Sequence, residues 1–193
     1  MSSELPPDEL EWTPLRWGGA SFGTHVLVGD DSRLELRPST GAKVLVHGLW
    51  LAGVLTMAGG LFVYLNDADL GGLFVGVPML LVGVGLSLFL RRLLTHRVFD
   101  RGLGRYWDTR EGGDRFRPGP RALALAELRG VQVVREDVIG PESNYVADEL
   151  NLVLADRRRI NVIDHADTAR LREDAGRIAR WLGVPLWLAR SDG

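Results

Sequence analysis

The chain has 193 residues, and its 23 basic and 25 acidic side chains give a formal net charge of −2. This balance argues against a nucleic-acid-binding protein, because such proteins are usually basic. The chain contains no cysteine, which excludes disulfides, thiolate metal sites and cysteine nucleophiles. Lys43 is the single lysine, so a catalytic lysine cluster is also excluded.

The first part of the chain is predicted to hold a disordered tail and then the first strands of a soluble domain. Residues 1–11 are polar and acidic and contain proline, a composition typical of disorder. Residues 12–43 begin with the apolar side chains Trp12, Leu15 and Trp17, which we expect to dock on the domain or at a membrane surface. Residues 24–28 and 33–37 then predict a β-hairpin, because apolar alternation flanks a turn-forming sequence.

Two long apolar runs follow, at residues 44–65 and 70–90, and neither contains a charged side chain. A helix rises about 1.5 Å per residue, so roughly 20 apolar residues span the hydrocarbon core of a bilayer. In hydrocarbon each backbone polar group needs an internal partner, which favours helices. The sequence therefore predicts a transmembrane helical hairpin over residues 44–90.

Basic residues flank this hairpin on both sides, whereas the turn at residues 66–69 has none. The flanking residues are Arg33, Arg37 and Lys43 before the hairpin, and Arg91, Arg92, Arg97 and Arg101 after it. Since arginine and lysine concentrate on the cytoplasmic side, we expect both termini to be cytoplasmic.

Gly72 and Gly76 have the spacing of small residues that lets two helices approach closely. Two interpretations remain open. The pair either packs against the other helix of the same hairpin, or it forms the seam of a homodimer.

Residues 91–193 are predicted to complete the cytoplasmic domain with short strands and one helix. Runs rich in β-branched and aromatic residues, separated by glycine-rich turns, predict the strands. The predicted strands cover residues 96–100, 105–109, 122–125, 130–136, 145–154 and 160–163. An apolar tail at residues 186–188 could fold back on the core.

The helix of this part is predicted over residues 165–182. Its apolar residues recur at helical spacing, at Leu171, Ala175, Ile178 and Leu182. We expect Asp164 to cap this helix with Asp167 at its third position, as in a capping box. His165 would then lie exposed in the first turn.

The hairpin FDRGLGRYWD and the run ELNLVLADRRRINVIDHADTARLREDAGRIARWLGVPLW resemble small bacterial inner-membrane proteins with a cytoplasmic pleckstrin-homology-like (PH-like) domain. The resemblance implies an α+β membrane protein. Its two-helix transmembrane hairpin would be inserted in a PH-like antiparallel β-barrel or sandwich that a C-terminal helix caps. The resemblance supplies no catalytic residues.

Residues Asn161, Asp164, His165 and Asp167 form the most site-like constellation. Carboxylates and an imidazole could hold a divalent cation or transfer protons. Helix capping also accounts for the two aspartates, and we favour that interpretation. The other histidines, His25, His47 and His96, are scattered, and two imidazoles leave a zinc site incomplete. We therefore expect no catalytic residue, cofactor or metal.

Arginines provide the candidate contacts to lipid or to a partner. These are Arg91, Arg92 and Arg97 beside the hairpin, and Arg157, Arg158 and Arg159 at a predicted hairpin tip. A basic residue near an anionic leaflet contributes about 1 kcal/mol to membrane binding. The alternatives are a topological role for the first three and a solvated tip for the others.

The sequence thus predicts a non-enzymatic inner-membrane adaptor or scaffold that presents a cytoplasmic PH-like domain. Its expected partners are the bilayer and either a membrane protein or further copies of the chain, with no nucleic acid. One alternative is an accessory subunit of a membrane enzyme or transporter complex. Another is a membrane-bound hydrolase that uses Asp164 and His165.

Overall fold

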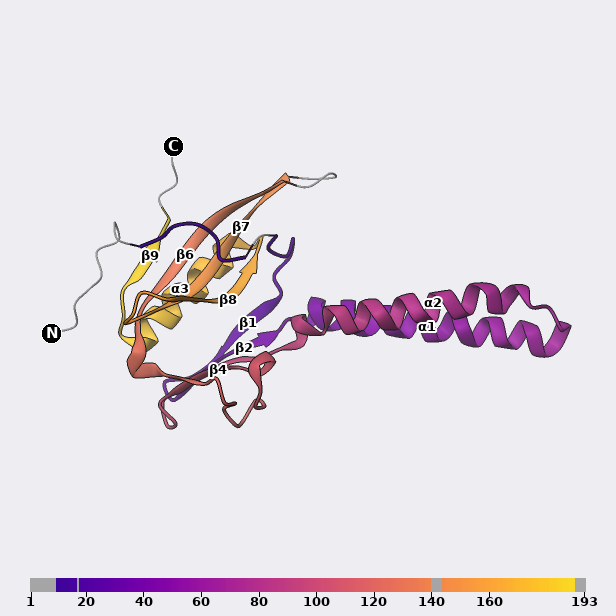
Figure 1. Cartoon of the computed structure of the whole chain (residues 1–193), viewed down its shortest axis with the longest axis horizontal. Coiled ribbons are helices and arrows are strands. Elements are labelled where there is room, and N and C mark those ends of the chain that lie inside the picture. Colours follow the sequence, from indigo (N-terminus) through magenta and orange to yellow (C-terminus); the bar gives the residue numbers. More distant parts are fainter. Residues whose placement is uncertain (1–9, 17, 140–143, 190–193) are drawn as a thin grey trace. The chain divides into compact units, whose positions relative to one another are not determined.

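The computed structural model describes residues 10–16, 18–139 and 144–189, so most of the predicted tail lies outside the described residues. The chain forms two units (Figure 1). The β domain comprises residues 1–37 and 96–193, and the helical hairpin comprises residues 38–95.

The first sheet of the β domain contains strands from both sides of the hairpin. Its order is β1 (His25–Gly29), β2 (Arg33–Pro38), β3 (Arg97–Asp100), β4 (Arg105–Asp108) and β5 (Leu123–Ala124). β2 and β3 are antiparallel, with Leu34 opposite Phe99 and Leu36 opposite Arg97. The hairpin is therefore an insertion between two directly paired strands.

The second sheet has the order β8–β7–β6–β9. Its strands are β6 (Leu128–Ile139), β7 (Asn144–Leu154), β8 (Arg159–His165) and β9 (Leu186–Leu188). The apolar tail folds back as expected, since β9 pairs in parallel with β6. Gly130 makes this possible, because a Cβ at that position would fall on the Trp187 ring.

One core joins the two sheets and helix α3 (Thr168–Leu182). Leu34, Phe99 and Tyr106 from the first sheet belong to the same buried cluster as Leu150 and Leu152 from the second. The unit is thus a mixed α+β domain. Neither sheet closes into a barrel in the described residues. β5 has only two residues, and it ends in a short 3-10 helix, η4 (Leu125–Glu127), which leads the chain into the second sheet.

Helix α3 buries the predicted face, but it begins later than predicted. Leu171, Ala175 and Ile178 are fully buried, and Leu182 is half-buried. The expectation that Asp164 caps the helix is wrong. Asp167 is the N-cap, since its side chain accepts a hydrogen bond from the Arg170 amide. Asp164 and His165 belong to β8, and His165 is buried instead of exposed.

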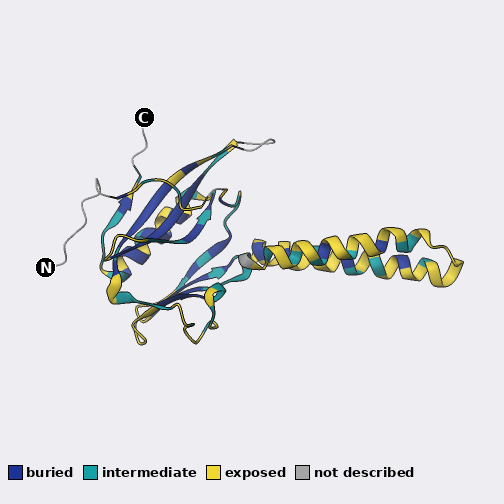
Figure 2. Ribbon diagram, viewed as in Figure 1, coloured by how far each residue is buried: buried dark blue, intermediate teal, exposed yellow. Residues whose placement is uncertain are grey.

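The hairpin consists of α1 (Thr40–Asp67) and α2 (Gly71–Leu90), followed by the 3-10 helix η2 (Arg91–Leu94). α1 starts before the apolar run because Ser39 caps it, accepting from the Ala42 amide at 3.1 Å. Both helices are long and apolar enough to cross a membrane. Only 11% of the most apolar window of each helix is buried, whereas the core helix of a soluble protein would be mostly buried (Figure 2).

Glycines let the backbones of α1 and α2 meet. A Cβ on Gly60 would fall on the Gly72 carbonyl oxygen, and one on Gly76 would lie 3.0 Å from the Met57 Cα. A Cβ on Gly83 would lie 2.5 Å from the Leu49 carbonyl oxygen. Gly72 and Gly76 therefore face α1 within the hairpin, as the first of the two interpretations requires.

Replacing Gly83 by alanine is expected to push the two helices apart, because the backbone of Leu49 leaves no space for a Cβ. The matched control is Gly85→Ala, since a Cβ at Gly85 meets nothing within 4 Å. Both changes raise helix propensity by about 1 kcal/mol. We expect Gly83→Ala alone to lower the temperature at which the detergent-solubilised protein leaves its monodisperse size-exclusion peak. Equal temperatures for the two variants would contradict the close helix contact.

Candidate interaction surface on the first sheet

Glu35 gathers three basic side chains on the outer face of the first sheet. Its neighbours Leu34 and Leu36 point into the core, so the alternation of β2 turns Glu35 to the opposite face. The Glu35 carboxylate accepts hydrogen bonds from His96 at 2.6 Å, Arg37 at 2.9 Å and Arg115 at 3.0 Å. Burial alone would raise the pKa of Glu35, but the bonds from Arg115, Arg37 and His96 outweigh it and hold that pKa below its usual value.

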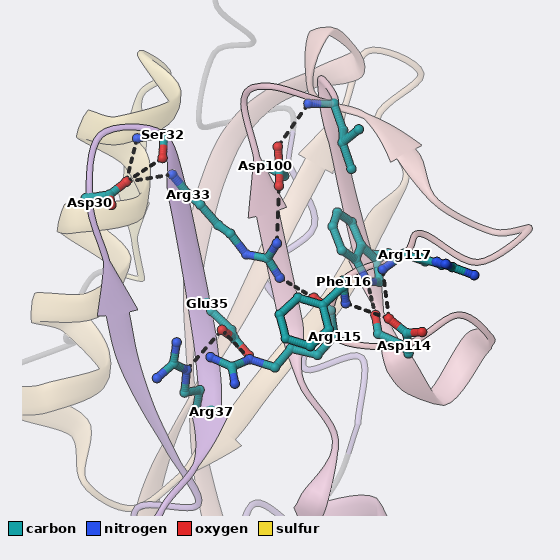
Figure 3. Close-up of polar contacts among 12 residues, drawn as sticks. Asp30, Ser32, Arg33, Glu35, Arg37, Asp100, Asp114, Arg115, Phe116 and Arg117 are labelled. Atoms are coloured by element: carbon teal, nitrogen blue, oxygen red, sulfur yellow. Dashed lines mark hydrogen bonds and ion pairs between the residues drawn. The ribbon is translucent and has the colours of Figure 1, made fainter.

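Arg115 belongs to the loop between β4 and β5, whose backbone makes several hydrogen bonds within the loop and to the sheet. Gly113 and Pro118 form an isolated bridge across the loop. The Asp114 carboxylate accepts from the amides of Phe116 at 2.6 Å and Arg117 at 2.9 Å, and the Asp114 carbonyl accepts from the Trp107 ring at 2.8 Å (Figure 3). The loop tip is therefore preformed on the sheet.

Arg33 connects this loop to β3. Its guanidinium lies 5.7 Å from the centre of the Trp107 ring and 5.8 Å from that of Phe116. It also donates to Asp100 at 3.4 Å and to the Arg115 carbonyl (Figure 3). Phe116 nevertheless remains 69% exposed. We call this region the Phe116 surface, comprising Arg33, Glu35, Arg37, Arg115, Phe116 and Arg117.

The arginines predicted to contact lipid or a partner differ in their exposure to solvent. Arg97 lies inside the domain, where it pairs with Asp108 at 3.3 Å and contacts His25. Burial lowers the pKa of Arg97 more than the Asp108 charge raises it. Arg91 is exposed directly after α2, and the side chain of Arg92 is outside the described part of the chain.

The three arginines at the predicted hairpin tip also differ in their exposure. Arg157 and Arg158 are exposed in the turn after β7, where Arg158 pairs with Asp156 at 2.5 Å. The Arg159 side chain is only 5% exposed, and it donates to the Thr13 carbonyl at 2.8 Å. Two of the three arginines are thus exposed at the surface, and the third is not.

Thr13 belongs to residues 10–16 and 18–20, which lie across the outer face of the second sheet and which we call the strap. The Glu149 carboxylate accepts from the amides of Leu15 at 2.9 Å and Arg16 at 2.8 Å. Glu136 accepts from the Gly18 amide at 2.8 Å. Buried carboxylates of the sheet therefore hold the backbone of the strap.

Further side chains complete the attachment of the strap. Tyr145 donates to the Gly19 carbonyl at 2.5 Å, and Gln132 donates to that of Glu11 at 2.9 Å. Leu10 and Trp12 pack beside Trp187 and Val153. Of the three side chains predicted to dock, Trp12 packs on the domain, the Leu15 side chain is exposed, and Trp17 lies outside the described residues.

The constellation Asn161, Asp164, His165 and Asp167 is spread over β8 and the helix cap. Burial lowers the pKa of His165, and burial together with the charge of Glu149 raises that of Asp164. In the part of the chain that the structure describes, no group of three or more metal-binding side chains comes together. His25 and His96 lie in the Arg97 and Glu35 clusters, and His47 lies on α1.

The Phe116 surface was not among the predicted sites, although the sequence Arg115-Phe116-Arg117 gave a signal for it, an aromatic residue between two arginines in a loop. Comparison of the chain with protein-family models, curated proteins and solved structures finds no match.

Proposed function

We propose that the chain is a non-enzymatic adaptor or scaffold of the bacterial inner membrane, whose hairpin anchors a cytoplasmic β domain. The observation that carries this proposal is the insertion of the hairpin between the paired strands β2 and β3. Both connections to the hairpin start at the same end of this strand pair. The domain is therefore attached to its anchor at two adjacent points, which suits a module that is held at a membrane.

The order of the elements supports a PH-like domain. Two sheets, antiparallel except for the pairing of β6 with β9, share one core, and a C-terminal helix packs into it. A domain of this kind would bind lipid or a partner protein through surface side chains, and the candidate contact residues Arg91, Arg157 and Arg158 lie at the surface. The hydrolase alternative has little geometric support, because His165 is fully buried in the core.

The distribution of basic residues supports the proposed orientation. Lys43 and Arg91 flank the hairpin, whereas the turn between the helices carries Asp67 and Asp69. Basic residues are retained on the cytoplasmic side. We therefore propose that both termini, and with them the β domain, are cytoplasmic and that the turn is periplasmic.

Cysteine labelling tests this orientation, because the chain has no cysteine of its own. Asp67→Cys places a thiol in the turn, and Asp156→Cys places one on an exposed turn of the β domain. In cells whose outer membrane has been made permeable, a membrane-impermeant maleimide is expected to label the Asp67→Cys variant only. The Asp156→Cys variant should react after the cells are lysed.

The parent chain provides the background for this labelling. Reaction of the Asp156→Cys variant in unlysed cells, with protection of the Asp67→Cys variant, would reverse the orientation. Reaction of both variants before lysis would exclude a membrane-spanning hairpin with a cytoplasmic domain.

An accessory subunit of a larger membrane complex is the second candidate, and one observation favours it. Gly48 and Gly59 lie on one face of α1, since eleven residues are close to three helical turns, and a Cβ on either would meet nothing within 4 Å. Small residues on a free face admit a neighbouring helix. Purification of the tagged chain in mild detergent separates the candidates. A stoichiometric integral-membrane partner identifies a subunit, and its absence favours the adaptor.

A further inference from the structure

We propose that the Phe116 surface docks on the anionic headgroups of the membrane that the hairpin of the same chain enters. The proposal rests on the membrane anchoring proposed above. It assigns a bilayer contact to the loop between β4 and β5, at residues that the sequence prediction did not include.

Arg115 attaches the loop to residues that lie close in sequence to the connections with the hairpin. Arg115 shares the Glu35 carboxylate with Arg37 and His96. Arg37 precedes the first residue of α1, Thr40, by three residues, a chain length of at most about 11 Å. His96 follows the hairpin directly. Through Glu35, the loop is thus bonded to both strands that continue into the hairpin, while the contact of Phe116 with Arg33 extends it along β2.

The side chain at the loop tip suits the membrane interface. The Asp114 bonds hold the loop backbone, and the ring contacts of Phe116 are with the guanidinium groups of Arg33 and Arg115. The ring therefore stays 69% exposed. Phenylalanine is among the apolar side chains that insert at the boundary between headgroups and acyl chains when basic residues lie beside them. Insertion of Phe116 would remove apolar area from water without any rearrangement of the loop.

The charge of the loop complements an anionic surface. Residues 110–121 contain four arginines and two acidic residues, whereas the whole chain is negatively charged. Asp114 is already bonded within the loop, and Glu35 is bonded beneath it. The Arg117 side chain is exposed and points away from the other labelled residues (Figure 3). Its charge remains available to lipid phosphates.

Leu103 provides a matched control on the same sheet. It is 52% exposed, and it lies in the turn between β3 and β4. β3 starts beside the hairpin and runs to this turn, so Leu103 lies at the opposite end of the strand. If exposed apolar side chains bound lipid without selectivity, labels near Phe116 and at Leu103 would contact the membrane equally.

The test uses the full-length chain reconstituted in lipid nanodiscs. A polarity-sensitive fluorophore is attached to the single cysteine of the Pro118→Cys variant or of the Leu103→Cys variant. The discs contain phosphatidylcholine alone or with phosphatidylglycerol, and a nitroxide lipid serves as the quencher. With phosphatidylglycerol, the Pro118→Cys label is expected to shift to the blue and to be quenched. The Leu103→Cys label is expected to behave as in water.

Two second-site changes identify the groups that dock. Phe116→Ser in the Pro118→Cys chain is expected to abolish the blue shift. Arg117→Gln removes one basic residue and is expected to lower the ratio of docked to free loop about fivefold. High salt should have an effect in the same direction, because it screens the exposed charges.

Failure of docking and failure of anchoring give different results. Co-elution of the chain with the discs reports the anchoring independently, and a chain that does not co-elute refutes the proposed function. Co-elution with equal quenching of the two labels would overturn the docking. Equal quenching of the Pro118→Cys label in the two lipid compositions would overturn the recognition of anionic headgroups.

Discussion

Replacing Leu171 by alanine is expected to lower the free energy of unfolding of the β domain by about 2–5 kcal/mol. Leu171 is fully buried on α3, in the cluster that also contains the inner faces of both sheets. The truncation leaves a cavity where the helix meets the core. Because a domain is stable by roughly 5–15 kcal/mol, this loss is a large part of the total. Thermal unfolding of the full chain in mild detergent measures it.

Glu173→Ala is the appropriate control for this experiment. Glu173 is exposed on the opposite face of α3, and surface changes usually stay within about 0.5 kcal/mol. Arg177 lies on the same exposed face, but it donates to the Gly29 carbonyl at 2.7 Å and so serves less well. If Leu171→Ala and Glu173→Ala unfold at the same temperature, the helix does not contribute to the core through the buried face.

Replacing Glu149 by glutamine is expected to release the middle of the strap. The carboxylate accepts from the amides of Leu15 and Arg16 and from the Asn151 side chain at 2.6 Å. In glutamine, one carboxylate oxygen is replaced by an NH2 group. This group cannot accept a hydrogen bond from the amide or side chain that faces it. Each hydrogen bond to a charged group contributes about 1.5–3 kcal/mol, so the strap should open more often. Hydrogen exchange should become faster in peptides that cover residues 10–20.

Glu127→Gln is the control for the strap, because Glu127 is exposed in the short helix before β6. The control variant should leave the exchange of the strap unchanged. Unchanged exchange in the Glu149→Gln variant as well would mean that the apolar contacts of Leu10 and Trp12 suffice to hold the strap.

The strand pattern of the chain could be predicted because it rests on local alternation. Residues 33–37 alternate between polar and apolar, and the structure places Leu34 and Leu36 in the core. The order of the sheets could not be predicted in the same way. β9 reaches β6 after the chain has passed through α3, and local sequence does not contain that pairing.

The start of α3 shows where capping signals are ambiguous. Asp164 and Asp167 both precede the helical pattern by a few residues, and either could act as the N-cap. β7 decides between them, because its Glu149 pairs with Asp164 and its Asp148 pairs with His165, which extends β8. The pairing of β8 with β7 thus overrides the local capping preference of Asp164. It also buries His165, which the sequence predicted to be exposed.

The strap was the least predictable feature of the domain. Glu136 and Glu149 occupy polar positions of alternating strands, and such positions normally face solvent. Here the strap covers that face, and the two glutamates become buried hydrogen-bond acceptors. Alternation alone does not distinguish a face in water from one that a distant segment covers.

The insertion of the hairpin also determines the order in which the β domain can assemble during synthesis. β2 leaves the ribosome before the whole hairpin, and its partner β3 follows only at Arg97. At about 5–20 residues per second, the edge of β2 waits roughly 3–12 s for its partner. Unpaired strand edges invite aggregation, and charged side chains protect them. Arg33, Glu35 and Arg37 lie on β2 and can give the nascent chain this protection before Glu35 becomes buried.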